Sequence, residues 1–180
     1  MAFKIGRRFF LNEAEKVAKE LLGMILVRKI GKKVLKAKIV ETEAYLDEND
    51  PASWARLGKR KDNFFMWEEG GTILLKNVHK YLMLNFVTYR KGKAQAVLIR
   101  ALEPLNFKGR CSGPGLLTNC LKIDRSFNGN KIYENKSFWI EDSKERLNQE
   151  IKESFRVGVK KDHKNKLRFY IKDNEYLSRK

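Results

Sequence analysis

The sequence has only two cysteines and two histidines, residue types that bind transition metals in proteins. Cys111 and Cys120 stand nine residues apart without a CxxC motif, and His79 and His163 lie in other parts of the chain. No metal-ligand spacing can be assembled from these four residues, so we expect neither a metal site nor another cofactor. Both cysteines are expected to be small core residues.

Long apolar segments are also missing. No run approaches the roughly 18 apolar residues of a membrane span, and the first ten residues lack the apolar segment that a signal peptide needs. The sequence therefore predicts a soluble, intracellular protein without a membrane partner. Its expected location is the cytoplasm or nucleoid of a prokaryote, or the nucleus of a eukaryote.

Acidic residues are few relative to basic ones. The chain has 39 Lys and Arg against 22 Asp and Glu, which gives a formal net charge of +17. The basic residues recur along the whole chain, which favours a polyanionic partner with nucleic acid as the leading candidate. A lysine-rich surface without such a partner explains the charge alone and stays open.

Two helices are predicted from local signals. Asn12 and Glu15 resemble a capping box at the start of an amphipathic helix that Gly23 ends. A second helix should begin at Gly113-Pro114-Gly115, where proline suits the first turn, and run to about Leu121. The first helix is expected to serve packing rather than chemistry, because its apolar residues share one face: Ala14, Val17, Ala18, Leu21 and Leu22.

Runs of β-branched and apolar residues, separated by glycine or polar clusters, predict strands. They cover residues 24–30, 35–46, 72–76, 81–88, 94–102, 137–140, 156–160 and 167–171. With 42% hydrophobic residues and no repeat or linker, residues 1–180 should form a single compact α+β domain, a curved antiparallel β-sheet flanked by helices. A β-hairpin at residues 71–85 should protrude, and the long polar segment 47–63 predicts a functional loop.

Polar residues stand at several positions within apolar, strand-like runs, where burying an unpaired polar group costs several kcal/mol. Arg100 and Asn85 each interrupt such a run. In a third run, the alternation of a strand places four side chains on one face, namely Ile39, Glu41, Glu43 and Tyr45. One face of the predicted sheet therefore carries two carboxylates beside an aromatic ring.

These residue types suit general-base chemistry. A carboxylate next to Arg100 stays ionised near neutral pH, where it can accept a proton from water and stabilise positive charge on a sugar. An adjacent aromatic ring can stack on a flipped base. The pattern alone leaves a second interpretation open, in which Glu41 and Glu43 are solvated strand residues and Arg100 forms a packing salt bridge.

The predicted tip of the hairpin carries Asn77, Val78, His79 and Lys80. A basic tip with a bulky residue is suited to pressing into a minor groove and filling the space of an extruded nucleotide. Taken alone, this segment is more simply interpreted as an ordinary hairpin turn.

Several blocks of the sequence together match one family, in that family's order and over most of the chain: residues 21–23, 39–46, 71–72, 84–85, 97–104, 111–115, 156–159 and 167–170. In these blocks the chain resembles the alkyladenine (3-methyladenine) DNA glycosylases, as a divergent and shortened member. The resemblance implies a monofunctional base-excision-repair hydrolase that flips damaged purines out of double-stranded DNA and releases them. The implied substrates are 3-methyladenine, 7-methylguanine and hypoxanthine. Nothing in the sequence requires an oligomer, so a monomer is expected.

The resemblance also implies roles for individual residues. Glu43 would be the general base, Arg100 would help to hold the attacking water, and the backbone carbonyl of Val157 would complete the water site. Tyr45 would stack on the flipped purine. Asn85 would crowd the exocyclic amino group of normal guanine and so serve discrimination.

The hairpin tip and two departures from the family pattern complete these expectations. His79 is the expected DNA-intercalating residue, with Val78 as the alternative. Trp54 stands where relatives usually have a histidine that packs against the base, and Lys76 stands in place of a second stacking tyrosine. Both changes bear on which lesion is preferred.

Two other functions stay open from the sequence. One is a basic DNA-binding module, derived from a glycosylase, that recognises lesions without excising them, and the changes at Trp54 and Lys76 favour it. Against it, Glu43 and Arg100 are both present in matching contexts. The other is a basic RNA-associated structural protein, which explains the charge but not this pairing.

Overall fold

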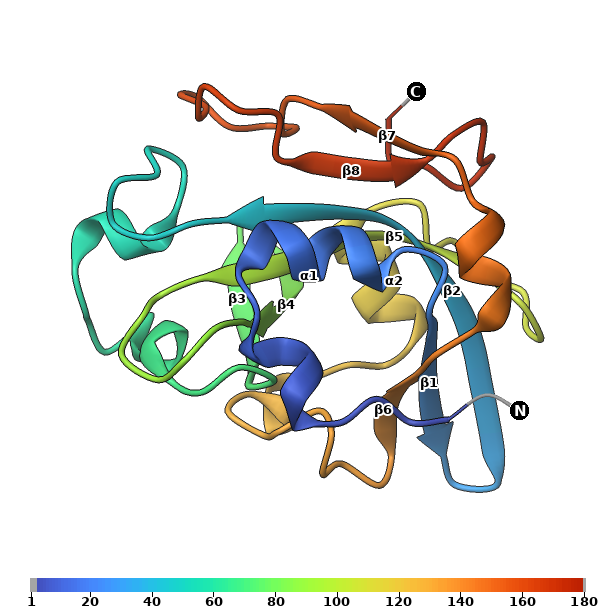
Figure 1. Ribbon diagram of the computed structural model, residues 1–180. Helices are drawn as coiled ribbons and strands as arrows, with labels where there is room; N and C mark the ends of the chain where they lie inside the picture. The colour runs from blue at the N-terminus through green and yellow to red at the C-terminus, as the bar shows by residue number, and fades with distance from the viewer. Residues whose placement is uncertain (1–2, 180) are drawn as a thin grey trace.

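Residues 3–179 are described by the computed structural model, in which they form one eight-stranded sheet with two short α-helices (Figure 1). The strands are β1 (Ile25–Ile30), β2 (Lys33–Tyr45), β3 (Ile73–Val78), β4 (Tyr81–Val87), β5 (Ala96–Pro104), β6 (Phe138–Glu141), β7 (Ile151–Ser154) and β8 (Arg168–Ile171). The α-helices are α1 (Ala14–Leu21) and α2 (Pro114–Cys120). The 3-10 helices are η1 (Arg7–Leu11), η2 (Trp54–Leu57), η3 (Phe64–Trp67), η4 (Arg125–Phe127) and η5 (Lys144–Asn148).

β2 is the strand around which the sheet is arranged. The strand order is β3-β4-β5-β2-β1-β6, and β8 pairs with both β2 and β7. The first half of β2 pairs with β1, and residues 41–43 pair with β8. Figure 1 shows β2 curving strongly along its length, with the β7–β8 hairpin beside its second half.

A β-bulge interrupts the pairing of β2 with β5. The register pairs Ile39 with Leu102 and then Glu41 with Ala101, so that the ladder skips Val40 and, on the other strand, Arg100. An extra residue bends a strand and re-aims its side chains. The strict alternation of side chains between the two faces of the sheet, predicted for β2, is therefore interrupted between Ile39 and Glu41.

α1 packs across β2 and β5 through its apolar face (Figure 1). Its buried residues are Ala14, Val17, Ala18 and Leu21, and Gly23 follows with φ of 81°, as expected for a residue that ends a helix. The Thr42 hydroxyl donates to the carbonyl of Ala18 over 2.9 Å, which ties the helix to the strand that carries Glu41 and Glu43. Fully buried aromatic side chains fill the rest of the core, namely Phe10, Phe86, Phe138 and Phe169.

The capping box predicted at the start of α1 is wrong. The residue before the helix is Glu13, whose side chain makes no capping hydrogen bond, and Asn12 donates to the carbonyl of Phe9 instead. The first amide of the helix, that of Ala14, donates to the side-chain oxygen of Gln95 over 2.8 Å. A side chain distant in the sequence thus satisfies the group that a local cap would serve.

The strand predicted over residues 156–160 is wrong, and β7 forms instead over residues that were not predicted to be a strand. Residues 156–160 were expected to be a strand, whereas β7 lies just before them and they form a loop. The buried side chain of Arg156 forms ion pairs in this loop instead of packing in a sheet, and Gly158 has φ of 76°, which an extended strand does not adopt.

The predicted fold class is confirmed: a curved antiparallel sheet, flanked by helices, in an α+β domain with a hairpin formed by β3 and β4.

Within residues 3–179, neither α1, α2 nor any other helix has the length and apolar character needed to cross a bilayer. Both cysteines are free thiols. Cys111 is fully buried and Cys120 packs against the same apolar core, which agrees with their predicted place.

Candidate active site

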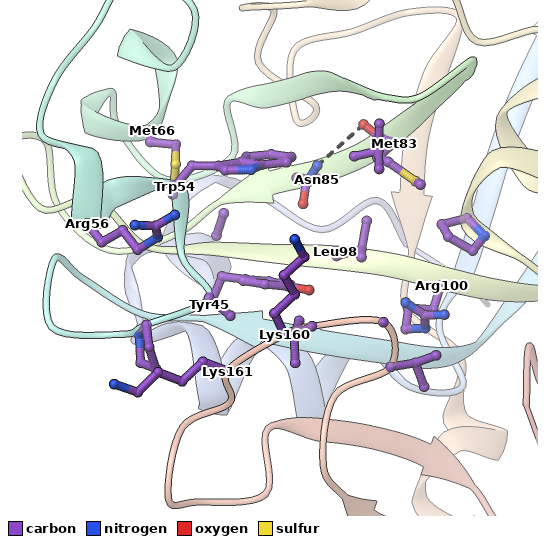
Figure 2. A pocket seen from close by; sticks show the side chains of 18 residues that line it. Tyr45, Trp54, Arg56, Met66, Met83, Asn85, Leu98, Arg100, Lys160 and Lys161 are labelled. Atoms are coloured by element: carbon purple, nitrogen blue, oxygen red, sulfur yellow. Dashed lines mark hydrogen bonds between the residues drawn. The ribbon is translucent and has the colours of Figure 1, made fainter.

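A pocket of about 680 Å³ opens where β2, β4 and β5 meet two loops, residues 47–63 and the segment that follows β7. Its lining mixes aromatic, apolar and basic side chains (Figure 2). Of the residues singled out from the sequence, the pocket brings together Tyr45, Trp54, Val78, Asn85, Arg100 and Val157.

Glu43 is fully buried and does not itself line the pocket, but it is bound by three residues that do. Its Oε1 accepts the backbone N–H of Val157 over 2.7 Å. Its Oε2 accepts the hydroxyl of Tyr45 over 2.9 Å and Nη1 of Arg100 over 3.4 Å. The contact to Val157 therefore runs through its amide, whereas the resemblance pointed to its carbonyl.

Burial raises the pKa of the Glu43 carboxyl above its ordinary value. The charge of Arg100, the Val157 amide and the Tyr45 hydroxyl lower that pKa, but they offset burial only in part. Arg100 thus favours the ionised form of Glu43, as expected from the sequence, whereas burial opposes it. Burial and the neighbouring Glu43 raise the pKa of Tyr45 well above its ordinary value, which keeps its hydroxyl available as a donor.

Arg100 is shared between two buried carboxylates. Its Nε lies 3.1 Å from Oε1 of Glu41, and a second arginine, Arg168 of β8, places its own Nε 2.8 Å from the same oxygen. Glu41 and Glu43 are both completely buried, so the interpretation of solvated strand residues is wrong. Two carboxylates and two arginines balance in charge, which lowers the cost of burying them.

Arg156 joins the two loops that close the pocket. Its guanidinium donates two hydrogen bonds of 2.7 Å to Asp50, and its Nε and backbone N–H each donate to Asp162 over 2.8 Å. Its guanidinium also lies 4.6 Å from the centre of the Tyr45 ring. Burial disfavours the Asp50 carboxylate, but hydrogen bonds from Arg156 and from two backbone amides outweigh this and lower its pKa.

The rings of Trp54 and Tyr45 lie on opposite sides of the pocket (Figure 2). Asn85 lies between them and donates its amide N–H groups to the carbonyls of Leu74 and Met83, each over 3.3 Å. Figure 2 shows its amide oxygen turned toward the space between the rings. The pocket thus offers two aromatic walls and one fixed acceptor to a planar ligand.

Lys76, expected to bind the substrate, does not line this pocket but contacts Trp54, which does. Its Nζ is 5.2 Å from the centre of the Trp54 ring and forms an ion pair with Asp62. Asn63 binds the carbonyl of Trp54 over 3.1 Å and so fixes the loop that presents the ring. The structure therefore places Lys76 as a support for Trp54.

The hairpin of β3 and β4 ends in a two-residue turn of His79 and Lys80. His79 is exposed and has φ of 52°, which a type II′ or I′ turn requires of its first central residue. Val78 is half-buried and lines the pocket. The two candidate intercalating residues thus occupy different places, one at the tip and one at the pocket edge.

Sequence reasoning missed several residues of the site. Arg168 was not singled out, although its charged side chain stands within an apolar, strand-like run, a signal that could have found it. Lys160 and Lys161 line the pocket, and Figure 2 shows Lys160 pointing into it from the loop after β7. Arg56 on η2 is a further basic residue of the lining.

Comparison with known proteins identifies the family of this chain. Residues 8–175 match the sequence profile of the methylpurine-DNA glycosylases. Proteins of Legionella pneumophila (strain Corby) and Borrelia garinii subsp. bavariensis are 39% and 40% identical over 98% of this chain, and the matches cover 98% and 100% of those proteins. A protein of Clostridium tetani is 37% identical over 98% of this chain and 100% of its own length. Each is named, provisionally, a 3-methyladenine DNA glycosylase.

The chain belongs to the methylpurine-DNA glycosylase family. DNA glycosylases are repair enzymes that hydrolyse N-glycosidic bonds, so the chain is a hydrolase of this class. The resemblance drawn from its sequence blocks is confirmed.

Proposed function

We propose that this enzyme flips an alkylated or deaminated purine out of duplex DNA into the pocket and hydrolyses its bond to the sugar, with Glu43 activating the water. The observation that carries the proposal is a buried carboxylate bound directly behind a pocket with two aromatic sides, by Arg100, Tyr45 and Val157, which line that pocket. The expected substrates are 3-methyladenine, 7-methylguanine and hypoxanthine.

Capture of DNA begins with charge. A net charge of +17 favours phosphate binding, and Arg56, Lys160 and Lys161 add positive charge at the pocket itself. The hairpin tip then fills the space that the extruded nucleotide leaves, through His79 or Val78. Flipping costs a few kcal/mol and least for weakly paired lesions, so selection starts before the base reaches the pocket.

Recognition follows from the walls of the pocket. A purine between Tyr45 and Trp54 stacks on both rings, with Arg156 behind Tyr45 and Lys76 beside Trp54. The amide of Asn85 is fixed by its two hydrogen bonds, so it crowds a substituent such as the 2-amino group of guanine instead of moving aside.

Hydrolysis needs Glu43 in its ionised form. As the glycosidic bond breaks, the base leaves with the bonding electrons and positive charge develops on the sugar, which the carboxylate stabilises. Water adds to the sugar carbon and gives its proton to Glu43. The 3.4 Å contact from Arg100 is the longest of the three to Glu43, so we expect the water to enter there. Cationic alkylated purines leave readily, whereas a neutral base such as hypoxanthine needs protonation.

The test is single-turnover release of base from duplexes that carry a methylated purine or hypoxanthine. Parent protein should release base, and Glu43→Gln should not, although it binds the same DNA. The matched control is Glu175→Gln, which makes the same chemical change at an exposed position and should release base like the parent. Tight binding without release from any lesion would favour the non-excising DNA-binding module.

We expect the enzyme to act as a monomer inside the cell, because one chain supplies every wall of the pocket described here. Light scattering after size-exclusion chromatography tests this directly. A dimer whose separation abolishes release would contradict it.

A further inference from the structure

The segment that follows β8 returns to the buried ionic cluster. Asn174 donates to Glu103 of β5 over 2.8 Å, and the carbonyl of Arg179 accepts Nη2 of Arg168 over 2.7 Å. Between these two anchors lies Ser178, which is half-buried. The segment is therefore docked on both sides of Ser178.

Ser178 binds Glu41 through both its backbone N–H and its hydroxyl, and the hydroxyl also binds Arg100. Its backbone N–H donates to Oε2 of Glu41 over 2.6 Å, and its hydroxyl donates to Oε1 over 2.8 Å. The hydroxyl oxygen also accepts Nε and Nη2 of Arg100, over 3.3 Å and 3.2 Å. A hydroxyl has one donor and two acceptor lone pairs, so these contacts use it fully.

We propose that Ser178 is a positioning residue that fixes the guanidinium of Arg100 so that Nη1 faces Glu43. Nε and Nη2 form one edge of the planar guanidinium, and Ser178 and Glu41 occupy that edge. Nη1 is then left for Glu43. The inference rests on the proposed role of Glu43 and extends it by naming what holds its arginine in place.

Competition between the two carboxylates explains why this positioning is needed. Arg100 lies closer to Glu41 than to Glu43, at 3.1 Å against 3.4 Å. Without the Ser178 hydroxyl, Glu41 loses one donor and Arg100 loses two contacts on the same edge. Arg100 then moves toward Glu41, and its charge supports the ionised form of Glu43 less.

The variant Ser178→Ala tests the inference. Single-turnover release at neutral pH should fall about tenfold, the effect of one hydrogen bond to a charged group. The acid side of the pH–rate profile should move to higher pH, because Glu43 loses part of the charge that favours its ionised form. Affinity for lesion-free duplex should not change, since Ser178 does not line the pocket.

Two further variants separate positioning from general stability. Ser154→Ala removes the hydroxyl that accepts Nη1 of Arg168 over 3.0 Å, a change in the same cluster without a contact to Arg100, and should leave the pH profile unchanged. Ser178→Thr keeps the hydroxyl and should restore the parent profile.

A readout that needs no activity completes the test. Carbon-13 NMR of the Glu43 carboxyl, assigned with Glu43→Gln, should show the titration midpoint of Glu43 at higher pH in Ser178→Ala than in the parent. An unchanged midpoint, or the same change in Ser154→Ala, would overturn the inference. A parent that releases no base refutes the proposed function, and the NMR titration still decides the effect of Ser178 on Glu43.

Discussion

The buried pair of Arg156 and Asp50 should be the most sensitive point of the loop that carries Trp54. Both side chains are fully buried, and the pair has two hydrogen bonds of 2.7 Å. The informative change is Asp50→Asn, which keeps the size of the side chain but removes its charge. Arg156 is then left with Asp162 as its acidic partner, over 2.8 Å.

The expected loss of stability follows from burial. Removing one partner of a buried ion pair costs about 3–5 kcal/mol, because the other charge is left without compensation. Asp162 retains part of that compensation, so we expect a loss of about 2–4 kcal/mol for Asp50→Asn. For a chain of this length, 1 kcal/mol corresponds to roughly 2–4 °C in Tm, so Tm should fall by about 5–15 °C.

The pH dependence has a defined sign. The pKa of Asp50 is lower in the folded chain than its ordinary value, so its contribution is present above that ordinary value, near pH ~4, and is lost as pH falls through the folded-state pKa. Parent protein should therefore lose stability on acidification below about pH 4 more steeply than Asp50→Asn. Urea denaturation at a series of pH values measures both quantities.

The control is Asp47→Asn, the same change three residues earlier at a partly exposed position, with an expected loss below about 0.5 kcal/mol. If Asp50→Asn unfolds at the same temperature and urea concentration as Asp47→Asn, the pair contributes nothing and the reasoning is refuted.

Three further predictions concern the pocket. Release of base should fall as pH drops through the raised pKa of Glu43. Tyr45→Phe should move this fall to higher pH, because the variant removes a hydrogen-bond donor to the Glu43 carboxylate, and pH–rate profiles of both proteins measure the change. Trp54→Ala should weaken binding of lesion-containing DNA by about 1–3 kcal/mol, the range for one base–aromatic stack, and Trp54→Phe should retain most of it in a fluorescence titration. The double variant Lys160→Gln/Lys161→Gln should lower the slope of log Kd against log salt by about 2, and an unchanged slope would place both lysines away from phosphate.

The parts of this site that could be predicted from sequence are those with a local signal. Arg100 interrupts an apolar run and Glu43 lies on one face of another strand, and these patterns singled both residues out while leaving a solvated, purely structural interpretation open. Alternation also placed Tyr45 beside Glu43, and the structure shows its hydroxyl bound to that carboxylate. In each case the informative residue and its signal lie within a few positions of each other.

The parts that could not be predicted depend on tertiary paths. Ser178 reaches Glu41 across 137 positions and Arg168 reaches it across 127, and nothing local announces either contact. The capping box failed for the same reason, since Gln95 satisfies the amide of Ala14 from 81 positions away. Local pattern indicates that a polar group needs a partner, and only the fold determines which partner it receives.

The two carboxylates on β2 show how the fold separates roles that the sequence leaves equivalent. Glu41 accepts hydrogen bonds from Arg100, Arg168 and both polar groups of Ser178, so its oxygens are fully engaged. Glu43 has one arginine at 3.4 Å, and burial raises its pKa because that compensation is incomplete. Glu43, whose ionised form is incompletely compensated, gains by accepting a proton from water. This difference favours Glu43 as the base and Glu41 as the group that, with Ser178, sets the position of Arg100.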